Sequence, residues 1–335
     1  MTDAILKVEA AKKYFPIQKG FMRKKIGDVR AVDGVSFEVR RGETFGLVGE
    51  SGCGKTTMAR MILRVLEPTS GQIEFHSESQ GWVDIPLLSK DKLKEVRKEI
   101  QMIFQDPFSS LNPRLPVFDI VAEPLLARGW KRKDCHDKVA DLLARVGLNP
   151  AYMQRYPHAF SGGQRQRIGI ARSLISDPSL VVADEPVSAL DVSVQAQTLN
   201  LLNELQHDFG LTYLFIAHDL SVIRYICDRV AVMYLGKIVE VAETDALFSS
   251  PRHPYTSALM ASVPDADPHS EWLYEVVRGE AKQSFGEGSG CSFSDRCPYT
   301  LDLCNYEEPA LELVDGSDHR VACHRANEIQ LRGVG

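Results

Sequence analysis

The spacing of apolar residues in the first part of the chain predicts a strand, a glycine-rich loop and a helix in succession. Residues 29–39, "VRAVDGVSFEV", have strand-like character, and the apolar run "GETFGLVG" predicts a further strand that ends at Gly49. After the loop, apolar residues follow the i, i+3, i+4, i+7, i+8 spacing of a helix with one buried face: Met58, Met61, Ile62, Val65 and Leu66. This order of elements is the context that a phosphate-binding loop requires.

A second set of apolar runs predicts more strands and helices further along the chain. The run "SLVVADE" at 179–185 is rich in β-branched residues and indicates a buried parallel strand that ends in two acids. The stretch "AQTLNLLNELQHDFG" predicts a helix closed by Gly210, and "TYLFIAH" predicts another strand that ends in His218. Strands that alternate with helices favour an α/β core with a largely parallel sheet.

Two segments differ in character from this core. Residues 106–176 have a mostly helical pattern, and "KDCHDKVADLLARVGL" places apolar side chains on one helical face: Val139, Leu142, Leu143 and Val146. After about residue 246 proline and glycine become frequent, and "SFGEGSG" at 284–290 indicates a linker. We therefore expect a large domain at 1–245, with an inserted helical subdomain at about 106–176, and a small cysteine-rich extension at 246–335.

Composition narrows the class of protein. The 335 residues are 44% hydrophobic, which is enough for a large core and suggests one to three domains. The formal net charge of −6 gives no electrostatic reason to expect a nucleic-acid partner. Apolar runs such as "LTYLFIA" fall short of the roughly 20 residues that a membrane helix needs. The start of the sequence has no apolar stretch typical of a secretory signal, so we expect a cytosolic protein with reduced cysteines.

The sequence "GESGCGKT" matches the G-x-x-x-x-G-K-[ST] pattern of a phosphate-binding loop. Its glycines allow backbone N–H groups to converge on phosphate oxygens, which side chains would prevent. Lys55 supplies a positive charge for the β- and γ-phosphates, and the Thr56 hydroxyl is placed to reach Mg²⁺. The residues predicted to bind ATP here are Gly49, Glu50, Ser51, Gly52, Cys53, Gly54, Lys55, Thr56 and Thr57.

Polar residues at the ends of the predicted strands are candidates for catalysis. We expect Asp184 to hold Mg²⁺ through water, and Glu185 to orient or deprotonate the attacking water. His218 is expected to contact the γ-phosphate, and Gln105, in "MIFQDP", either coordinates Mg²⁺ or senses the γ-phosphate. The predicted catalytic set is Glu185, His218, Lys55 and Gln105, and the predicted Mg²⁺ set is Thr56, Gln105 and Asp184.

These segments together resemble a known family. In order, "GESGCGKTT", "IFQDP", "FSGGQRQR", "VVADEP", "SALD" and "AHDL" are similar to motifs of the nucleotide-binding subunits of ABC transporters, over roughly residues 5–245. The resemblance implies an α/β fold of the P-loop NTPase (ABC ATPase) type with an N-terminal antiparallel β part. It also implies that two ATPase units pair head to tail, so that the ATP held by one unit is capped by the other.

The resemblance assigns a role to "SGGQ", which would otherwise be a second phosphate-binding segment in one chain. Ser161 is able to cap a helix and leave N–H groups free at the helix N-terminus. By the resemblance, Ser161 and Gly163 contact the γ-phosphate of the partner's ATP, and Asp191 in "SALD" lies at the seam between the two units. The signature segment is Ser161, Gly162, Gly163 and Gln164.

The resemblance also places an adenine-stacking aromatic residue in "KKYFP". Phe15 is the first candidate and Tyr14 the alternative, because an aromatic face is able to stack on any purine at little entropic cost. The following residues, 16–30, form a longer and more basic hairpin, which either faces lipid headgroups or is a solvated loop.

The segment "SPRHPYTSALMASVP", with the cysteines behind it, resembles a narrower group, the ATPase subunits of oligopeptide and dipeptide importers. This resemblance implies an ATPase at the cytoplasmic side of the inner membrane that energises peptide import. Its partners would be a second ATPase subunit (a paralogue or itself), two membrane-spanning permease subunits and an extracytoplasmic peptide-binding protein, and motion would reach the permeases near residues 105–112. The alternatives are another cargo, such as nickel or glutathione, or a soluble ABC ATPase of nucleic-acid metabolism.

The cysteines of the extension are spaced x5, x6 and x18: Cys291, Cys297, Cys304 and Cys323. Clustered thiolates in a reducing compartment indicate a soft metal centre. Structural zinc prefers closely spaced C-x₂₋₄-C pairs, which this sequence lacks, so a [4Fe–4S] cluster fits better, and some importers of the resembled group carry one here. Zn²⁺ is the alternative metal, with His319 or His324 as a substitute ligand. A third hypothesis is that the cysteines are structural thiols without a metal.

Overall fold

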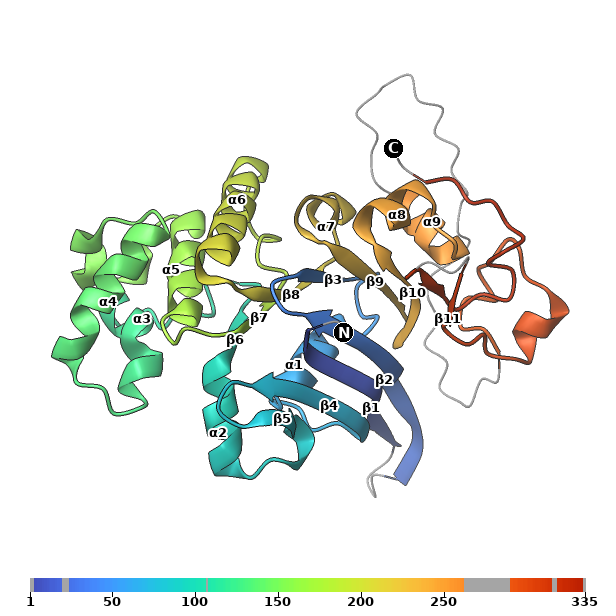
Figure 1. Ribbon diagram of the computed structural model, residues 1–335, viewed down its shortest axis with the longest axis horizontal. Coiled ribbons are helices and arrows are strands. Elements are labelled where there is room, and N and C mark those ends of the chain that lie inside the picture. The colour runs from blue at the N-terminus through green and yellow to red at the C-terminus, as the bar shows by residue number, and fades with distance from the viewer. Residues whose placement is uncertain (1–2, 20–23, 107, 262–289, 315–317, 334–335) are drawn as a thin grey trace.

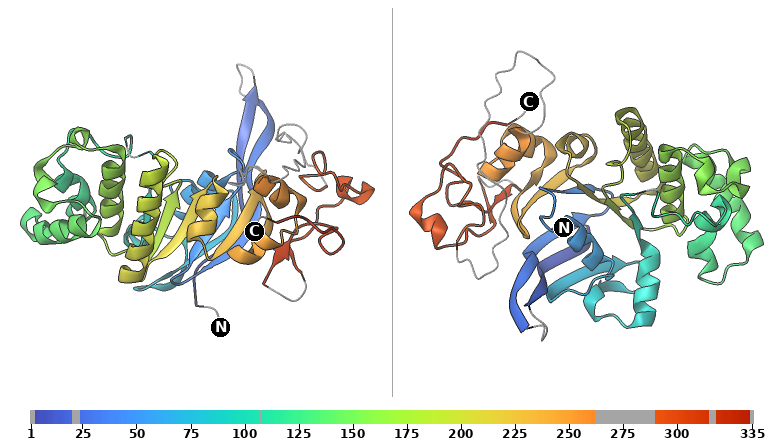
Figure 2. Two further views of the ribbon diagram at one scale, coloured as in Figure 1. Left: turned by 90° about the horizontal axis from the view of Figure 1, so that it is seen from above. Right: turned by 180° about the vertical axis from the view of Figure 1, so that it is seen from behind.

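The computed structural model describes residues 3–19, 24–106, 108–261, 290–314 and 318–333. Its smaller sheet is antiparallel, with strand order β2-β1-β4-β5: β1 (Ala4–Lys19), β2 (Lys24–Arg40), β4 (Ser70–Ser77) and β5 (Gly81–Asp84). Strands β1 and β2 pair along their whole length and project from the body as a long hairpin, which Figure 2 shows from above. The tip of this hairpin, including Arg23 of the predicted basic segment, lies outside the described residues.

The larger sheet has the order β11-β12-β10-β9-β3-β8-β7-β6. Its strands are β3 (Thr44–Val48), β6 (Ile100–Ile103), β7 (Leu180–Asp184), β8 (Thr212–Ala217), β9 (Arg229–Tyr234), β10 (Lys237–Glu243), β11 (Glu312–Leu313) and β12 (Arg320–Val321). Strands β9, β3, β8, β7 and β6 run parallel to one another, whereas β10 pairs antiparallel with β9, β12 with β10, and β11 with β12. Strands β3, β7, β8 and β9 are buried over their full length, which is why they appear in the sequence as continuous apolar runs. The expectation of an α/β core is confirmed.

Helix α1 (Lys55–Ile62) lies between the two sheets (Figure 1). Its Met58 and Met61 are fully buried in one apolar cluster with side chains from both sheets. The expectation that Val65 continues this buried face was wrong, since Val65 is 70% exposed. The helix ends at Ile62, and Arg64 with φ +48° turns the chain before the next helical turn is formed.

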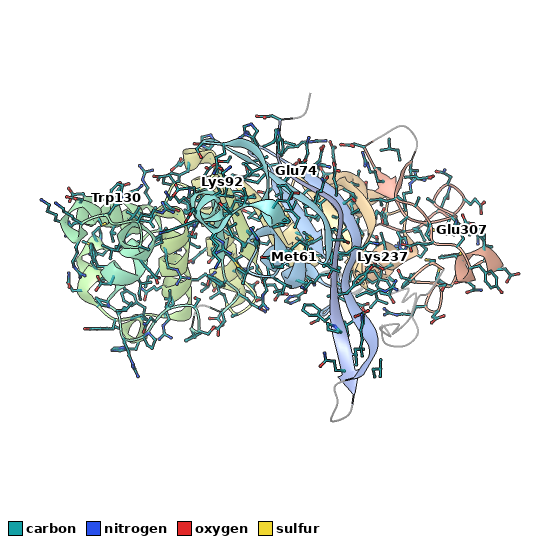
Figure 3. All side chains as sticks on the ribbon, turned by 90° about the horizontal axis from the view of Figure 1, so that it is seen from below. Met61, Glu74, Lys92, Trp130, Lys237 and Glu307 are labelled. Atoms are coloured by element: carbon teal, nitrogen blue, oxygen red, sulfur yellow. The ribbon has the colours of Figure 1, made fainter. Side chains whose placement is uncertain are left out.

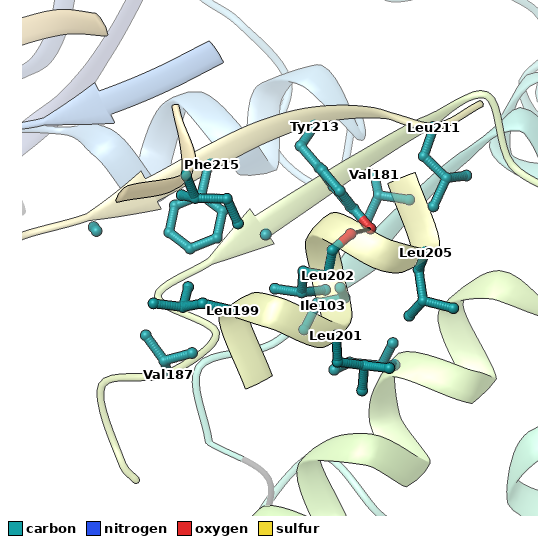
Figure 4. Packing of buried hydrophobic residues seen from close by; sticks show 14 of the residues in the cluster. Ile103, Val181, Val187, Leu199, Leu201, Leu202, Leu205, Leu211, Tyr213 and Phe215 are labelled. Carbon is teal, nitrogen blue, oxygen red and sulfur yellow. Dashed lines mark hydrogen bonds between the residues drawn. The ribbon is translucent and has the colours of Figure 1, made fainter. Parts of the chain in front are cut away.

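The opposite face of the larger sheet is covered by α6 (Val192–Phe209), α7 (Leu220–Ile226) and α8 (Thr244–Ser249) (Figure 1). Figure 4 shows Leu199 and Leu202 of α6 packed beneath β7 and β8, close to Val181 and Phe215. As the sequence predicts, α6 ends at Gly210, whose φ of +63° lies in the left-handed region that glycine adopts without strain.

The segment between β6 and β7, for which the sequence predicts mostly helix, contains α3 (Val117–Leu126), α4 (Arg132–Arg145), α5 (Gly162–Leu174) and the 3₁₀ turns η2 (Pro150–Gln154) and η3 (Pro157–Ala159). It forms one end of the molecule in Figure 1. The apolar face expected on α4 is buried there: Val139, Leu142, Leu143 and Val146. Before β6 the chain forms η1 (Ile85–Leu87) and α2 (Lys90–Glu99).

The C-terminal part forms α9 (Pro254–Ala261), η4 (Asp302–Asn305), β11 and β12. Strand β12 pairs with β10, so these residues extend the larger sheet. The fully buried Glu240 carboxylate accepts N–H groups of Arg252 (2.6 Å) and His253 (3.0 Å) and lies 2.7 Å from Nε2 of His319. These contacts fix the extension to the sheet. Residues 284–289 of the predicted linker lie outside the described residues.

Figure 3 shows Trp130 and Glu307 at opposite ends of the elongated molecule, with Lys237 and Met61 between them. Over the described part of the chain, no helix combines the length and the apolar character needed to span a membrane.

Candidate active site

Strands β3, β7 and β8 end at the same edge of the larger sheet. In their register Val48 lies beside Ala217, and Asp184 beside Ile216. The residues that follow these strands therefore start their loops side by side, at the edge where α/β proteins bind ligands. A cavity of about 460 Å³ opens there, lined by Ala31, Ser51, Gly52, Gly54, Lys55, Thr56, Thr57, Gln105, Glu185 and His218.

The glycine loop is enclosed by neighbouring backbone. A Cβ atom on Gly54, which has φ +115°, would lie 2.0 Å from the carbonyl oxygen of Ala31. A Cβ atom on Gly49 would lie 2.1 Å from the carbonyl oxygen of Met233. Both positions therefore require glycine for space as well as for conformation. Gly49, Glu50 and Cys53 belong to the predicted ATP-binding set but are not among the residues that line the cavity.

Lys55 and Thr56 begin α1 and place a positive charge and a hydroxyl at the cavity. The Lys55 ammonium donates to the carbonyl oxygens of Gly49 (2.7 Å) and Glu50 (3.0 Å). The Thr56 hydroxyl donates to Oδ1 of Asp184 over 3.2 Å, so two predicted Mg²⁺ ligands are in direct contact. Burial raises the pKa of Asp184 against the lowering effect of the Thr56 hydrogen bond. A buried carboxylate of this kind is an oxygen ligand suited to a hard divalent cation.

Glu185 is contacted on both carboxylate oxygens. Nε2 of Gln105 donates to Oε2 over 2.6 Å, and Nδ1 of His218 lies 3.1 Å from Oε1. Glu185 also has φ +48°, a conformation that costs a non-glycine residue free energy and that clusters at functional sites. The structure thus brings the predicted catalytic residues of three separate segments together at one point.

The two aromatic candidates for adenine stacking differ in availability. The Tyr14 hydroxyl is hydrogen-bonded to Asp33, and burial together with Asp33 raises the pKa of Tyr14 to about 12. Phe15 is 38% exposed, and Lys13 lies 5.3 Å from its ring centroid. Both are on β1, which pairs with β2 near Ala31 of the cavity wall. Phe15 is therefore the more accessible of the two, whereas the Tyr14 hydroxyl is engaged by Asp33, and neither residue is among those that line the cavity.

We expect Phe15→Ala to raise the dissociation constant for ATP about tenfold, because stacking of a base on an aromatic ring is worth about 1–3 kcal/mol. Phe15→Trp should keep the affinity near that of the wild type. The matched variant Tyr14→Phe should leave ATP binding unchanged and lower the free energy of unfolding by about 1 kcal/mol, since Asp33 loses a partner. Nucleotide titration and thermal denaturation measure the two effects, and unchanged ATP affinity in Phe15→Ala would contradict stacking by Phe15.

The signature segment begins α5. The Ser161 hydroxyl accepts the N–H of Gln164 (3.3 Å), and Oε1 of Gln164 accepts the N–H of Ser161 (3.1 Å), which completes a capping box. The expected N-cap is confirmed. Among the described residues that line the cavity of the same chain, none belongs to the signature. A Cβ atom on Gly163 would lie 2.5 Å from Cγ1 of Val194, so the signature packs against the start of α6, next to the exposed Asp191.

The cysteines of the extension converge. Cys291, Cys297, Cys304 and Cys323 line one small cavity, and the N–H of Cys291 donates to the carbonyl oxygen of Cys304 over 2.7 Å. Burial raises the pKa of Cys291 and Cys297, and that of Cys323 to about 11, so without a metal these groups are protonated thiols. Within the ranges that the structure describes, no three His, Cys, Asp or Glu side chains are arranged around a single metal ion.

The histidines proposed as substitute ligands are placed differently. His324 lines the thiol cavity, and its Nε2 lies 3.0 Å from the carbonyl oxygen of Glu307. His319 instead contacts Glu240 and is not among the cavity-lining residues. No sequence pattern indicated His253, which also lines the cavity and whose pKa is lowered to about 3 by burial.

Comparison with known proteins agrees with this geometry. The ABC transporter family matches residues 32–188, and the family described as the oligopeptide/dipeptide transporter C-terminal region matches residues 239–304. The chain is 52% identical over 326 residues to the oligopeptide transport ATP-binding protein AppF of Bacillus subtilis, covering 96% of this chain and 97% of that protein. It is 42% identical over 327 residues to the di/tripeptide transport ATP-binding protein DppF of Pseudomonas aeruginosa, covering 97% and 99%.

Among solved structures, the fold is similar to that of the ATP-binding cassette MJ0796, described as a dimeric post-hydrolysis state bound to ADP and Pi. The TM-score is 0.61 at 25% identity, over 72% of this chain and 99% of that one. The chain belongs to the ATP-binding proteins of the ABC transporter family, in the group that carries the oligopeptide/dipeptide transporter C-terminal region.

Proposed function

We propose that this protein is the ATP-hydrolysing subunit of an importer for di- and oligopeptides, bound peripherally at the cytoplasmic side of the inner membrane. The names of the relatives and the match to the oligopeptide/dipeptide C-terminal region support peptides over nickel or glutathione as cargo, and transport over nucleic-acid metabolism. The partners are a second ATPase subunit, two permease subunits and an extracytoplasmic peptide-binding protein. Residues 1–245 are the ATPase domain, with the helical subdomain at about 106–176, and residues 246–335 are the extension.

The observation that carries the proposal is the meeting of Lys55, Gln105, Glu185 and His218 at one cavity beside the glycine loop. The test is the ATPase rate of the assembled transporter. Binding protein loaded with peptide should stimulate hydrolysis, and binding protein offered nickel or glutathione should not. Stimulation by either of these and not by peptide would contradict the assignment of cargo.

The chemistry is in-line attack of water on the γ-phosphorus, which forms phosphate and releases ADP. Lys55 exchanges the carbonyl oxygens of Gly49 and Glu50 for phosphate oxygens when the nucleotide binds. Glu185 accepts the proton of the attacking water, and His218 orients Glu185 and the γ-phosphate. Mg²⁺, held by Thr56, Asp184 and Gln105, would neutralise charge on the β- and γ-phosphates.

We propose both roles for Gln105, as a ligand of Mg²⁺ and as a sensor of the γ-phosphate. Its Nε2 group donates to Glu185, which leaves its carbonyl oxygen free for a cation. The same hydrogen bond occupies Oε2 of Glu185, so movement of Gln105 frees that oxygen to accept a proton. Gln105 begins the segment that leads to α3, and we infer that displacement of the helices by the permeases reaches Glu185 along this route.

The ATP is held between two subunits. Ser161 and Gly163 of one subunit contact the γ-phosphate at the loop of the other, with Asp191 at the seam. The signature residues lie at a helix N-terminus whose free N–H groups favour an anion, and they lie apart from the cavity-lining residues of their own chain.

We also propose that the four cysteines hold a [4Fe–4S] cluster. The proposal is supported by the four soft ligands that line one cavity, whose other walls include Phe293, Pro254 and Ile329. The metal requires thiolates, so its binding releases the protons that burial keeps on the thiols. Zn²⁺ remains the second candidate because His324 also faces the cavity.

Anaerobic purification should give a brown protein with iron and sulfide near four each per chain. Cys297→Ser should lose the colour and the iron, whereas Cys135→Ala, in the core of α4, should keep both. Iron and acid-labile sulfide analysis measures the outcome. Zinc without iron would overturn the cluster in favour of a zinc site.

A further inference from the structure

The turn between the first two cysteines of the extension contacts the phosphate-binding loop. The Arg296 guanidinium pairs with the Glu50 carboxylate through two contacts, 3.1 Å to Oε1 and 3.2 Å to Oε2. It also donates to the Tyr234 hydroxyl over 3.3 Å. The Arg296 side chain is only 12% exposed, and a two-point guanidinium–carboxylate pair fixes both the position and the plane of the carboxylate.

The backbone of Glu50 is held as well. Its N–H donates to the hydroxyl of Tyr255 over 2.9 Å, and Tyr255 lies buried on α9. Its carbonyl oxygen accepts from the Lys55 ammonium (3.0 Å) and from the N–H of Cys53 (3.2 Å). Two of the groups that hold Glu50 therefore come from beyond residue 246, and a third is the lysine that must contact the triphosphate.

Arg296 is supported by a packed aromatic cluster. The ring centroids of Tyr234 and Tyr255 are 4.5 Å apart, and Phe293 lies 5.3 Å and 5.5 Å from them. The guanidinium lies 5.7 Å from the Tyr234 ring and 5.8 Å from the Phe293 ring. The N–H groups of Arg296 and Cys297 both donate to the carbonyl oxygen of Phe293, so the turn that carries the thiol also sets the arginine.

The negative charge of Glu50 makes its pairing with Arg296 relevant to ATP binding. Glu50 is the second residue of the loop, and a free carboxylate there would repel a triphosphate bound to the same loop. Arg296 compensates that negative charge and holds the Glu50 carboxylate in one orientation. We propose that Arg296 is a positioning residue for ATP, acting through Glu50, and that the C-terminal extension is thereby a part of the nucleotide site. The proposal rests on the role of residues 49–57 proposed above.

The test is equilibrium titration of the intact chain with a fluorescent ATP analogue and its ADP counterpart. Arg296→Ala should weaken ATP binding about tenfold and ADP binding less, because the unpaired carboxylate repels the larger charge more strongly. Adding Glu50→Gln to Arg296→Ala should restore most of the lost affinity, because the repelling carboxylate is then removed. Arg320→Ala, on the exposed side of β12, is the matched control and should change nothing.

Steady-state hydrolysis in the assembled transporter gives a second readout: KM for ATP should rise with Arg296→Ala while kcat stays within about twofold. If Arg296→Ala does not fold, Arg296→Lys carries the test, with an expected loss of about threefold because one point contact replaces two. Unchanged ATP affinity in the folded variants, or a double variant as weak as Arg296→Ala, would overturn the proposal. Lys55→Ala separates failure of the Arg296 proposal from failure of the proposed ATP-binding loop, because normal ATP binding by Lys55→Ala would refute the assignment of the loop.

Discussion

Glu185→Gln is expected to lower the rate of ATP hydrolysis about a thousandfold, the middle of the range for loss of a general base. The amide has nearly the shape of the carboxylate, so the cavity and its contacts to Gln105 and His218 remain, but it does not accept the proton of water. It also removes a negative charge that faces the γ-phosphate. The variant should therefore bind ATP without cleaving it and accumulate as an ATP-bound pair of ATPase subunits.

Phosphate release and size-exclusion chromatography with and without Mg-ATP measure these two effects. Glu204→Gln, an exposed position on α6, is the control and should hydrolyse ATP at the wild-type rate. Undiminished hydrolysis by Glu185→Gln would contradict the role of Glu185 as general base. If hydrolysis is lost but the subunits do not pair in Mg-ATP, the expected ATP-bound pair would be contradicted.

Lys55→Ala is expected to weaken ATP binding about a hundredfold, roughly 2.7 kcal/mol, because a charge-assisted hydrogen bond to phosphate is lost. The residue is 5% exposed, and its ammonium already lies against the loop that forms the phosphate site. Titration with a fluorescent nucleotide checks the result. Lys92→Ala, exposed on α2, should bind as the wild type does, and tight binding by Lys55→Ala would contradict the assignment of the loop.

Much of the site follows from local sequence. The glycine loop, the following helix and the acids at the end of β7 are each encoded by neighbouring residues, because backbone space and strand alternation act over short distances. The candidate catalytic residues could therefore be named from the sequence, and the structure places Gln105, Glu185 and His218 within hydrogen-bonding distance of one another.

What could not be predicted depends on residues far apart in the chain. Arg296 meets Glu50 across 246 positions, and no spacing rule connects a turn in a cysteine-rich segment to a loop near the other end. Strand β12 has only two residues, too short to show alternation, yet it joins the extension to the larger sheet. Val65 was misassigned because a helical pattern continues in the sequence after the left-handed Arg64 has ended the helix.

The central claim is that each ATP lies between the phosphate loop of one subunit and the signature of its neighbour. Two inactive variants test it most directly when mixed: one with Lys55→Ala, the other with Ser161→Ala and Gly163→Ala. A mixed pair then contains one pocket with both defects and one with none, so the mixture should hydrolyse ATP well above either variant alone. If each chain instead used its own loop and its own signature, every pocket would be defective, and the mixture would stay as inactive as its components.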